Sequence, residues 1–152
     1  MTPATPLDRS LERSRLAGEG ALSPRPRGLY PLELTARCAH PDEVLQRARS
    51  VLEVVLRADP DEWPSAETWR EQLPAWFTEA CGSEERKTGW TLENFVYWFT
   101  PDLRQWWWWQ AEVNGPEALV IILLSDEVDP PQEALVWLLR TAGATEIVRF
   151  QD

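Results

Sequence analysis

The stretch LELTARCAHPDEVLQRARSVLEVVL, residues 32–56, indicates a β-strand followed by an amphipathic helix. Apolar and polar residues alternate over residues 32–38, which is the pattern of a half-buried strand. Pro41 then suits the first turn of a helix, and two acidic residues follow it. This helix carries one apolar stripe, formed by Val44, Leu45, Ala48, Val51, Leu52, Val55 and Leu56. Asp59-Pro60 ends the helix, so the stretch predicts one strand and one helix that share a core.

The C-terminal third of the chain predicts a strand, a second strand, a helix and a last strand. Residues 106–113 form the first strand, and Asn114-Gly115 is a strong hairpin signal before the apolar run 118–124. A helix over residues 129–143 opens with an acidic cap and a glutamine at the capping-box position, and it closes at a glycine. A last short strand is predicted over residues 146–150.

Between these two parts, residues 60–104 are rich in tryptophan and predict short helices. Ser65 can cap a first helix, which Pro74 interrupts before a stop at Gly82. A charged loop is expected over residues 83–89. A third short helix follows, with one apolar side formed by Leu92, Phe95, Val96 and Phe99.

With the Trp-rich segment set aside, the elements follow the order βαββαβ. This is the order of a ferredoxin-like split βαβ sandwich. We therefore predict an α+β fold of this kind, with a Trp-rich helical insertion over residues 60–104 between the first helix and the second strand. A single domain is expected over residues 29–152. The Pro-, Arg- and Ser-rich segment 1–28 is expected to be a disordered N-terminal tail, because it has too little apolar area to offset its ordering entropy.

The composition is strongly acidic. Because the chain has 25 Asp and Glu against 15 Lys and Arg, with a formal net charge of -10, we expect neither nucleic acid nor a membrane surface as a partner. The longest apolar run, residues 118–124, is far shorter than the roughly 20 residues that a membrane span needs. Residues 1–28 show no secretory signal pattern, so we expect a cytoplasmic protein with reduced Cys38 and Cys81.

Few residues of the chain are suited to catalysis. His40 is the only histidine, and its place before Pro41 at a helix start favours an exposed or capping role. Cys38 lies two residues away, so a Cys/His pair is an alternative, but no third orienting residue is identifiable. Two acidic clusters, residues 59–62 and 126–129, lack the spacing of a calcium loop, and no phosphate-binding glycine motif is present. We therefore expect no cofactor and no metal, and favour a protein that is not an enzyme.

The ten tryptophans, four of them consecutive, place aromatic groups on both faces of the predicted sheet. Strict alternation in strand 106–113 predicts one face with Trp107, Trp109, Ala111 and Val113, and another with Trp106, Trp108, Gln110 and Glu112. The run 118–124 is apolar throughout, so both of its faces should be covered. The expected cover is the Trp-rich insertion, with Trp63, Trp69, Trp76, Trp90 and Trp98. In the alternative, part of the aromatic face stays open as a binding surface.

These features favour a non-catalytic protein-binding domain of the inhibitor, immunity or adaptor type. Such a domain would bind a basic protein partner through an acidic rim and an aromatic patch. The alternative is a small-molecule binder or sensor with an aromatic cleft between the helical insertion and the sheet. A homodimer through the edge strand 106–113 is a further option. The candidate binding residues are Trp63, Arg104, Trp106, Trp108, Glu112, Asp126, Glu127 and Asp129.

Overall fold

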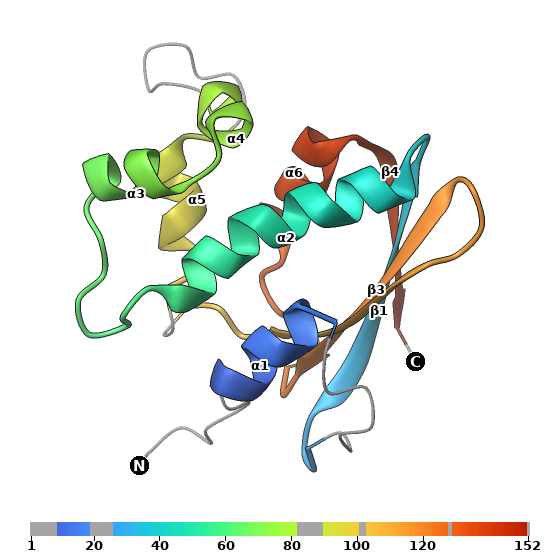
Figure 1. Ribbon diagram of the computed structural model, residues 1–152. Helices are drawn as coiled ribbons and strands as arrows, with labels where there is room; N and C mark the ends of the chain where they lie inside the picture. The colour runs from blue at the N-terminus through green and yellow to red at the C-terminus, as the bar shows by residue number, and fades with distance from the viewer. Residues whose placement is uncertain (1–8, 19–25, 82–89, 101–102, 128, 152) are drawn as a thin grey trace.

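The computed structural model describes residues 9–18, 26–81, 90–100, 103–127 and 129–151 (Figure 1). Within these residues the fold is α+β, with one sheet and a layer of helices. The elements in chain order are α1 (Arg9–Leu16), β1 (Tyr30–Cys38), α2 (Pro41–Arg57), α3 (Ala66–Gln72), α4 (Ala75–Ala80), α5 (Leu92–Tyr97), β2 (Trp107–Val113), β3 (Ala118–Ser125), α6 (Glu133–Ala142) and β4 (Ala144–Gln151).

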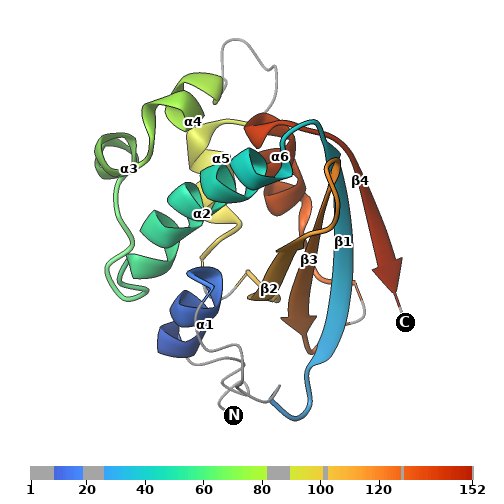
Figure 2. The ribbon, with the colours of Figure 1, turned by 45° about the vertical axis from the view of Figure 1, so that its right-hand side comes forward.

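The four strands form one antiparallel sheet in the order β2-β3-β1-β4. β3 lies between β1 and β2, and both are antiparallel to it, so β1 and β2 run parallel to each other. The chain leaves β1 through α2 and the shorter helices α3, α4 and α5 before it returns as β2. α2 and α6 pack against each other on one face of the sheet (Figure 2).

The main core lies between the sheet and these two helices. Apolar residues of β1 pair in register with apolar residues of β3 on this face: Leu32 with Leu123, Leu34 with Ile121, and Ala36 with Leu119. The predicted apolar stripe of α2 is entirely buried, which confirms the strand and helix expected from residues 32–56. The inward side of α6 is buried as well, at Ala134, Leu135, Leu138, Leu139 and Ala142.

The ends of the helices follow the sequence signals with two differences. α2 begins at Pro41, and α6 ends at Ala142, immediately before Gly143, whose φ of 130° favours glycine. His40 and Gln132 precede the two helices, but neither side chain makes a capping hydrogen bond. α6 begins at Glu133, which is four residues later than the acidic cap predicted at residue 129.

The Trp-rich segment forms three short helices, as predicted, and two of them begin at residues whose side chains cap the helix. The side-chain oxygens of Ser65 and Thr91 accept hydrogen bonds from the backbone N–H groups of Thr68 and Asn94 at the starts of α3 and α5. Pro74 separates α3 from α4. The predicted stop at Gly82 and the charged loop over 83–89 lie outside the described residues.

The aromatic side chains of this segment pack on the helical layer. The rings of Phe77 and Phe95 lie 5.5 and 6.1 Å from the ring of Trp137 in α6, measured between centroids. Trp69 is fully buried, and the other tryptophans of the segment pack partly buried against the same core. The segment therefore packs into the same core as Trp106 and Trp108, as expected, but it does not form a separate core on the helix-free face of the sheet, so that part of the expectation is wrong.

The N-terminal segment contains a helix that the sequence did not predict. Disorder was expected for residues 1–28, yet Arg9–Leu16 form α1, which packs beside β2 and the C-terminal half of α2 (Figure 1). Leu16 is completely buried in the main core. The domain boundary expected at residue 29 therefore excludes a helix that shares the core.

A β-bulge in β2 changes the predicted faces of this strand. Trp108 pairs with Leu123, but Gln110 pairs with Ile122, so the register shifts by one residue between them. Because a bulge residue is left unpaired, strict alternation fails at this point. Ala111 and Val113 consequently join Trp106 and Trp108 on the helical side, and the two faces predicted for residues 106–113 are wrong in this respect.

A second, smaller apolar cluster lies on the other face of the sheet. Trp107, Trp109 and Leu124 are buried there, with Leu11 of α1, Leu29 and Ile122 packed against them. α1 therefore lies at the edge of β2 with Leu16 on the core side and Leu11 on the opposite side. One end of the second face is thus covered by the segment that was expected to be a disordered tail.

Candidate functional site

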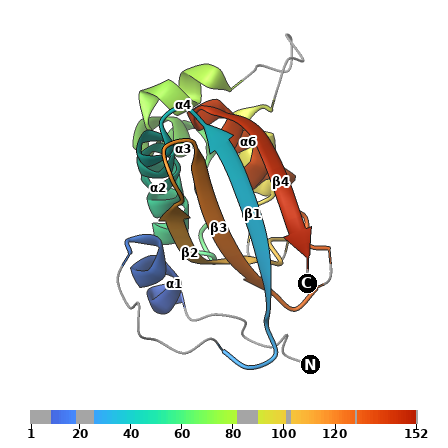
Figure 3. The same cartoon turned by 90° about the vertical axis from the view of Figure 1, so that its right-hand side faces the viewer.

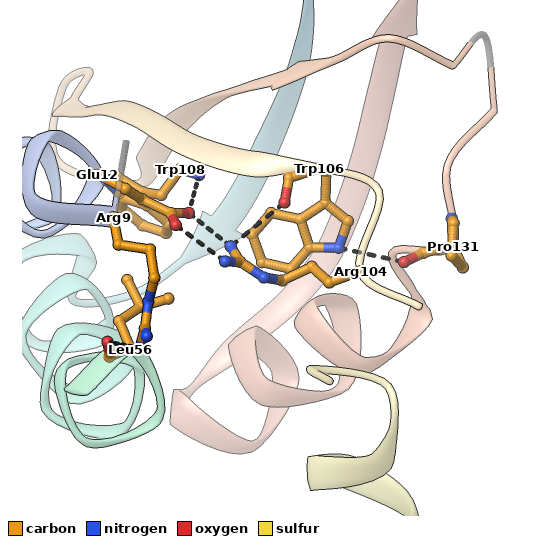
Figure 4. A network of polar contacts seen from close by, with 7 residues as sticks. All are labelled: Arg9, Glu12, Leu56, Arg104, Trp106, Trp108 and Pro131. Carbon is orange, nitrogen blue, oxygen red and sulfur yellow. Dashed lines mark hydrogen bonds and ion pairs between the residues drawn. The ribbon is translucent and has the colours of Figure 1, made fainter. Parts of the chain in front are cut away.

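Two of the predicted aromatic anchors are not accessible. Trp106 is 2% exposed and Trp108 is 0% exposed, and both belong to the main core. The indole Nε1 of Trp106 donates a hydrogen bond of 3.1 Å to the carbonyl oxygen of Pro131, which ties β2 to the start of α6 (Figure 4). The interpretation of these side chains as an open binding patch is therefore wrong, because a partner could not contact them without opening the core.

Arg104 is a buried structural cation. Its Nη1 and Nη2 donate to Oε2 and Oε1 of Glu12 over 2.5 and 2.9 Å (Figure 4). Nη1 also donates to the carbonyl oxygen of Trp106 over 3.3 Å, and both carboxylate oxygens of Glu12 are thus engaged. A buried pair of this geometry holds α1 on the sheet, so Arg104 positions an element of the fold and is not available to a ligand.

Side chains of α1 occupy hydrogen-bonding groups of β2, an edge strand. The backbone N–H of Trp108 donates to Oε2 of Glu12 over 2.8 Å, and the carbonyl oxygen of Trp109 accepts from Nε of Arg15 over 2.7 Å. The Arg15 guanidinium also lies 4.0 Å from the centre of the Trp109 ring, and burial lowers its pKa. A homodimer through this strand, which the sequence left as an option, would have to displace α1 at these two residues.

The acidic candidates lie in two separate places. Asp126 and Glu127 are exposed just after β3, and Asp129 forms an ion pair with Arg149. Glu112 is exposed near the opposite end of β2, where it pairs in register with Val120. Six residues of extended chain separate Val120 from Asp126, or about 20 Å. The structure therefore does not gather the predicted charges around one aromatic patch.

Trp63 is the one predicted anchor that keeps some exposure. It is partly buried and lies edge-on to Trp69, with 5.2 Å between ring centroids. Its indole Nε1 is buried without a hydrogen-bond partner, as is that of Trp69. Edge-on packing of two aromatic rings is favourable, so the pair stabilises the start of α3.

The Cys/His alternative lacks an activated thiol. Cys38 is buried at the end of β1, its Sγ lies 3.7 Å from the carbonyl oxygen of Ala36, and burial raises its pKa. His40 is exposed. A nucleophilic cysteine needs a lowered pKa and a base within reach, so this pair does not form such a site. Within the described part of the chain, no group of three His, Cys, Asp or Glu side chains is placed to hold a metal ion.

The middle of the second face of the sheet carries no helix of the described chain, as Figure 3 shows. Register places Thr35 of β1 between Val120 of β3 and Val148 of β4 on this face, and Ile122 lies beside Glu33. The four apolar or neutral side chains are only half-buried, and Glu33 is exposed. We name this surface the open sheet face: Glu33, Thr35, Val120, Ile122 and Val148.

Sequence reasoning missed Glu12 and Arg15 because it treated their segment as disordered. The available signal was weak: residues 9–16 are helix-forming but contain only two leucines. The partners of Glu12 and Arg15 lie 92 to 96 residues away in the chain, so no local pattern reveals them.

No protein-family model, characterised protein or solved structure matches this chain in our comparisons. None of the described helices has the length and apolar character required to cross a membrane.

Proposed function

We propose that the chain is a ferredoxin-like split βαβ sandwich with the Trp-rich segment inserted between α2 and β2. The order β1, α2, β2, β3, α6, β4 supports this assignment, as does the position of β3 between β1 and β2. α1 is an N-terminal addition that lies along the free edge of β2.

For its function, we propose a non-catalytic protein-binding domain that binds a basic partner on the open sheet face. The observation that carries this proposal is the composition of β3, whose residues 118–124 are apolar on both faces of the sheet. Exposed faces of antiparallel sheets normally carry polar residues. Val120 and Ile122 instead remain half-buried, and a partner that covered them would complete the burial.

The charges around this face favour a basic partner. Glu33 lies within the face, and Glu146 at its β4 edge is only weakly paired with Arg37 at 3.8 Å, with both side chains largely exposed. Asp126 and Glu127 follow β3 directly. These carboxylates on a chain of net charge -10 would speed association with a basic surface and would repel an acidic one.

An exposed aromatic residue lies next to this acidic end. Tyr30 is 64% exposed and pairs in register with Ser125, immediately before Asp126. Tyrosine is enriched at the centres of interfaces because it offers a large rigid surface with a polar tip. Tyr30 therefore replaces Trp106 and Trp108 as the aromatic candidate in this proposal.

The alternative, an aromatic cleft between the insertion and the sheet, receives less support at that location. Phe77, Phe95 and Trp137 contact one another between α4, α5 and α6. Phe99 continues this contact to Trp106 at 5.6 Å. Rings packed in this way fill the space in which a ligand would bind.

Affinity capture from the native cell lysate, at low and moderate salt, tests the protein-binding proposal. We expect a basic protein that is retained at low salt and released as the salt rises. Val120→Lys should abolish its capture, because it removes apolar area and adds a like charge at the centre of the open sheet face. Glu79→Lys, an exposed change on α4, should leave capture unchanged. Equal capture by wild type and folded Val120→Lys protein would refute the proposed surface.

A further inference from the structure

A small cavity of about 290 Å³ lies where α1, α2 and β2 meet. Figure 2 shows this junction, with α1 below α2 and beside β2. The apolar residues of the open sheet face do not line the cavity, so a ligand here is independent of the protein-binding proposal. Its wall includes Arg15, Gly18, Arg49, Trp109, Gln110 and Glu112.

One guanidinium group of the cavity is held in place by β2. Nε of Arg15 donates to the carbonyl oxygen of Trp109 over 2.7 Å, and Nη2 donates to the side-chain oxygen of Gln110 over 3.4 Å. The Trp109 ring lies under the same group at 4.0 Å. The cation is therefore fixed before a ligand arrives, which lowers the entropic cost of binding.

The second guanidinium group contains a buried donor without an acceptor. Nε of Arg49 is shielded from solvent and has no hydrogen-bond partner, and the described residues supply no ion pair for this side chain. An unsatisfied buried donor of a charged group is costly. Gly18 lies beside this group, since a Cβ at its position would be in ordinary contact with Nη2 of Arg49 at 3.4 Å.

An unpaired carboxylate lines the same cavity. Glu112 is exposed and makes no hydrogen bond or ion pair with the described part of the chain, Arg49 included. The Arg49 guanidinium and the Glu112 carboxylate thus line one cavity without forming an ion pair with each other. Trp109, which is 5% exposed, also lines the cavity.

We infer that this cavity binds a free amino acid with an apolar side chain. Its carboxylate would accept hydrogen bonds from Arg49 and from the Gln110 amide beside Arg15, since guanidinium groups suit planar carboxylates. Its ammonium group would pair with Glu112, and its side chain would lie against Trp109. A zwitterion of this kind satisfies both signs of charge in a cavity of this volume.

Other small ligands fit the charges less well. A phosphate or a dicarboxylate would meet Glu112 and the field of a chain with net charge -10. A simple cation would instead meet the Arg49 guanidinium, whose Nε has no hydrogen-bond partner. The inference therefore requires both charges on one molecule.

Isothermal titration calorimetry of the full chain tests this site with L-alanine, L-valine, L-leucine, L-methionine and L-phenylalanine, each added alone. We expect saturable binding of at least one of them at a submillimolar Kd. The amide and the N-acetyl derivative of the tightest ligand should each bind at least about tenfold more weakly, because each lacks one of the two charges. In ¹H–¹⁵N spectra, the Trp109 indole signal, assigned by Trp109→Phe, should shift on binding.

Matched variants separate the site from a general effect of charge. Arg49→Met and Glu112→Gln should each weaken binding at least about tenfold, since each removes one charged contact and neither side chain forms a hydrogen bond or ion pair within the described part of the chain. Arg140→Met and Glu117→Gln make the same changes at exposed positions outside the cavity and should bind as wild type does. The inference is overturned if none of the five amino acids binds at millimolar concentration. It is also overturned if the N-acetyl derivative binds as tightly as its parent, or if Arg49→Met and Glu112→Gln have no effect.

Discussion

Glu12 of α1 and Arg104 form a two-pronged ion pair, with 2.5 Å between Oε2 and Nη1 and 2.9 Å between Oε1 and Nη2. Both side chains are at least nine-tenths buried. The same carboxylate accepts the backbone N–H of Trp108 over 2.8 Å. One glutamate of the N-terminal helix is therefore bonded both to Arg104, in the segment that precedes β2, and to the edge of the sheet (Figure 4).

Removal of Glu12 should destabilise the protein strongly. Glu12→Ala leaves the Arg104 cation buried and unpaired, so we expect the free energy of unfolding to fall by about 3–5 kcal/mol. Glu43→Ala removes one partner of an exposed pair with Arg47 on α2 and should cost about 0.5 kcal/mol or less. Urea unfolding of the two variants measures the difference. Equal losses would mean that the buried pair has no special part in stability.

Release of α1 should expose a sheet edge that associates with itself. Glu12→Ala combined with Arg15→Ala frees the N–H of Trp108 and the carbonyl oxygen of Trp109, and unpaired strand edges pair readily with other strands. We expect the double variant to sediment as a larger species than wild type as its concentration rises. The charge-matched variant Glu43→Ala with Arg47→Ala should sediment as wild type does. A double variant that matches wild type at all concentrations would show that α1 does not protect this edge.

Trp108 should behave as a core residue and not as an interface residue. Its side chain is 0% exposed, so Trp108→Ala should lower the free energy of unfolding by about 3–5 kcal/mol. Trp98→Ala truncates a partly buried ring against the same core and should cost clearly less. Denaturant unfolding monitored by far-UV circular dichroism compares the two. A small loss for Trp108→Ala would revive the interpretation of this ring as an accessible anchor.

The sequence predicts best those strands and helices in which buried apolar and exposed polar side chains recur with the period of the element. Leu34 and Leu52 each belong to an apolar series with the period of their element, and both are buried in the structure. The order of strands and helices along the chain follows from such series. Their arrangement into the sheet order β2-β3-β1-β4 depends on pairing between distant segments and comes from the structure.

Two features could not be predicted because their signals are not periodic. Four identical residues, 106–109, contain no alternation, so the sequence does not indicate that the chain bulges at Trp109 and returns Ala111 to the core side. α1 is held largely by charged side chains whose partners lie far along the chain, as Glu12 and Arg104 illustrate. Because two of the tryptophans predicted as binding residues are buried, the candidate sites in the structure are instead the open sheet face and the cavity beside α1.

The last prediction concerns the thiol of Cys81. Burial and the nearby carboxylate of Glu93 raise its pKa to about 11 from an ordinary value of 9.0, although Arg70 acts in the opposite direction. At pH 8 the thiolate fraction should therefore be about 100-fold lower than in an unfolded chain, and alkylation by iodoacetamide correspondingly slower. The rate at Cys81, read by mass spectrometry of the digested protein, should rise about tenfold per pH unit until pH 11.

Two substitutions test the causes of this pKa, and the pH dependence of stability tests its sign. Glu93→Gln should speed alkylation of Cys81, and Arg70→Met should slow it, because they remove the raising and the lowering charge respectively. The folded state holds the proton more tightly than the unfolded chain does, so this contribution to stability is complete below pH 9.0 and is lost as the pH rises to about 11. Alkylation at pH 8 as fast as in urea would show instead that the Cys81 thiol is freely solvated.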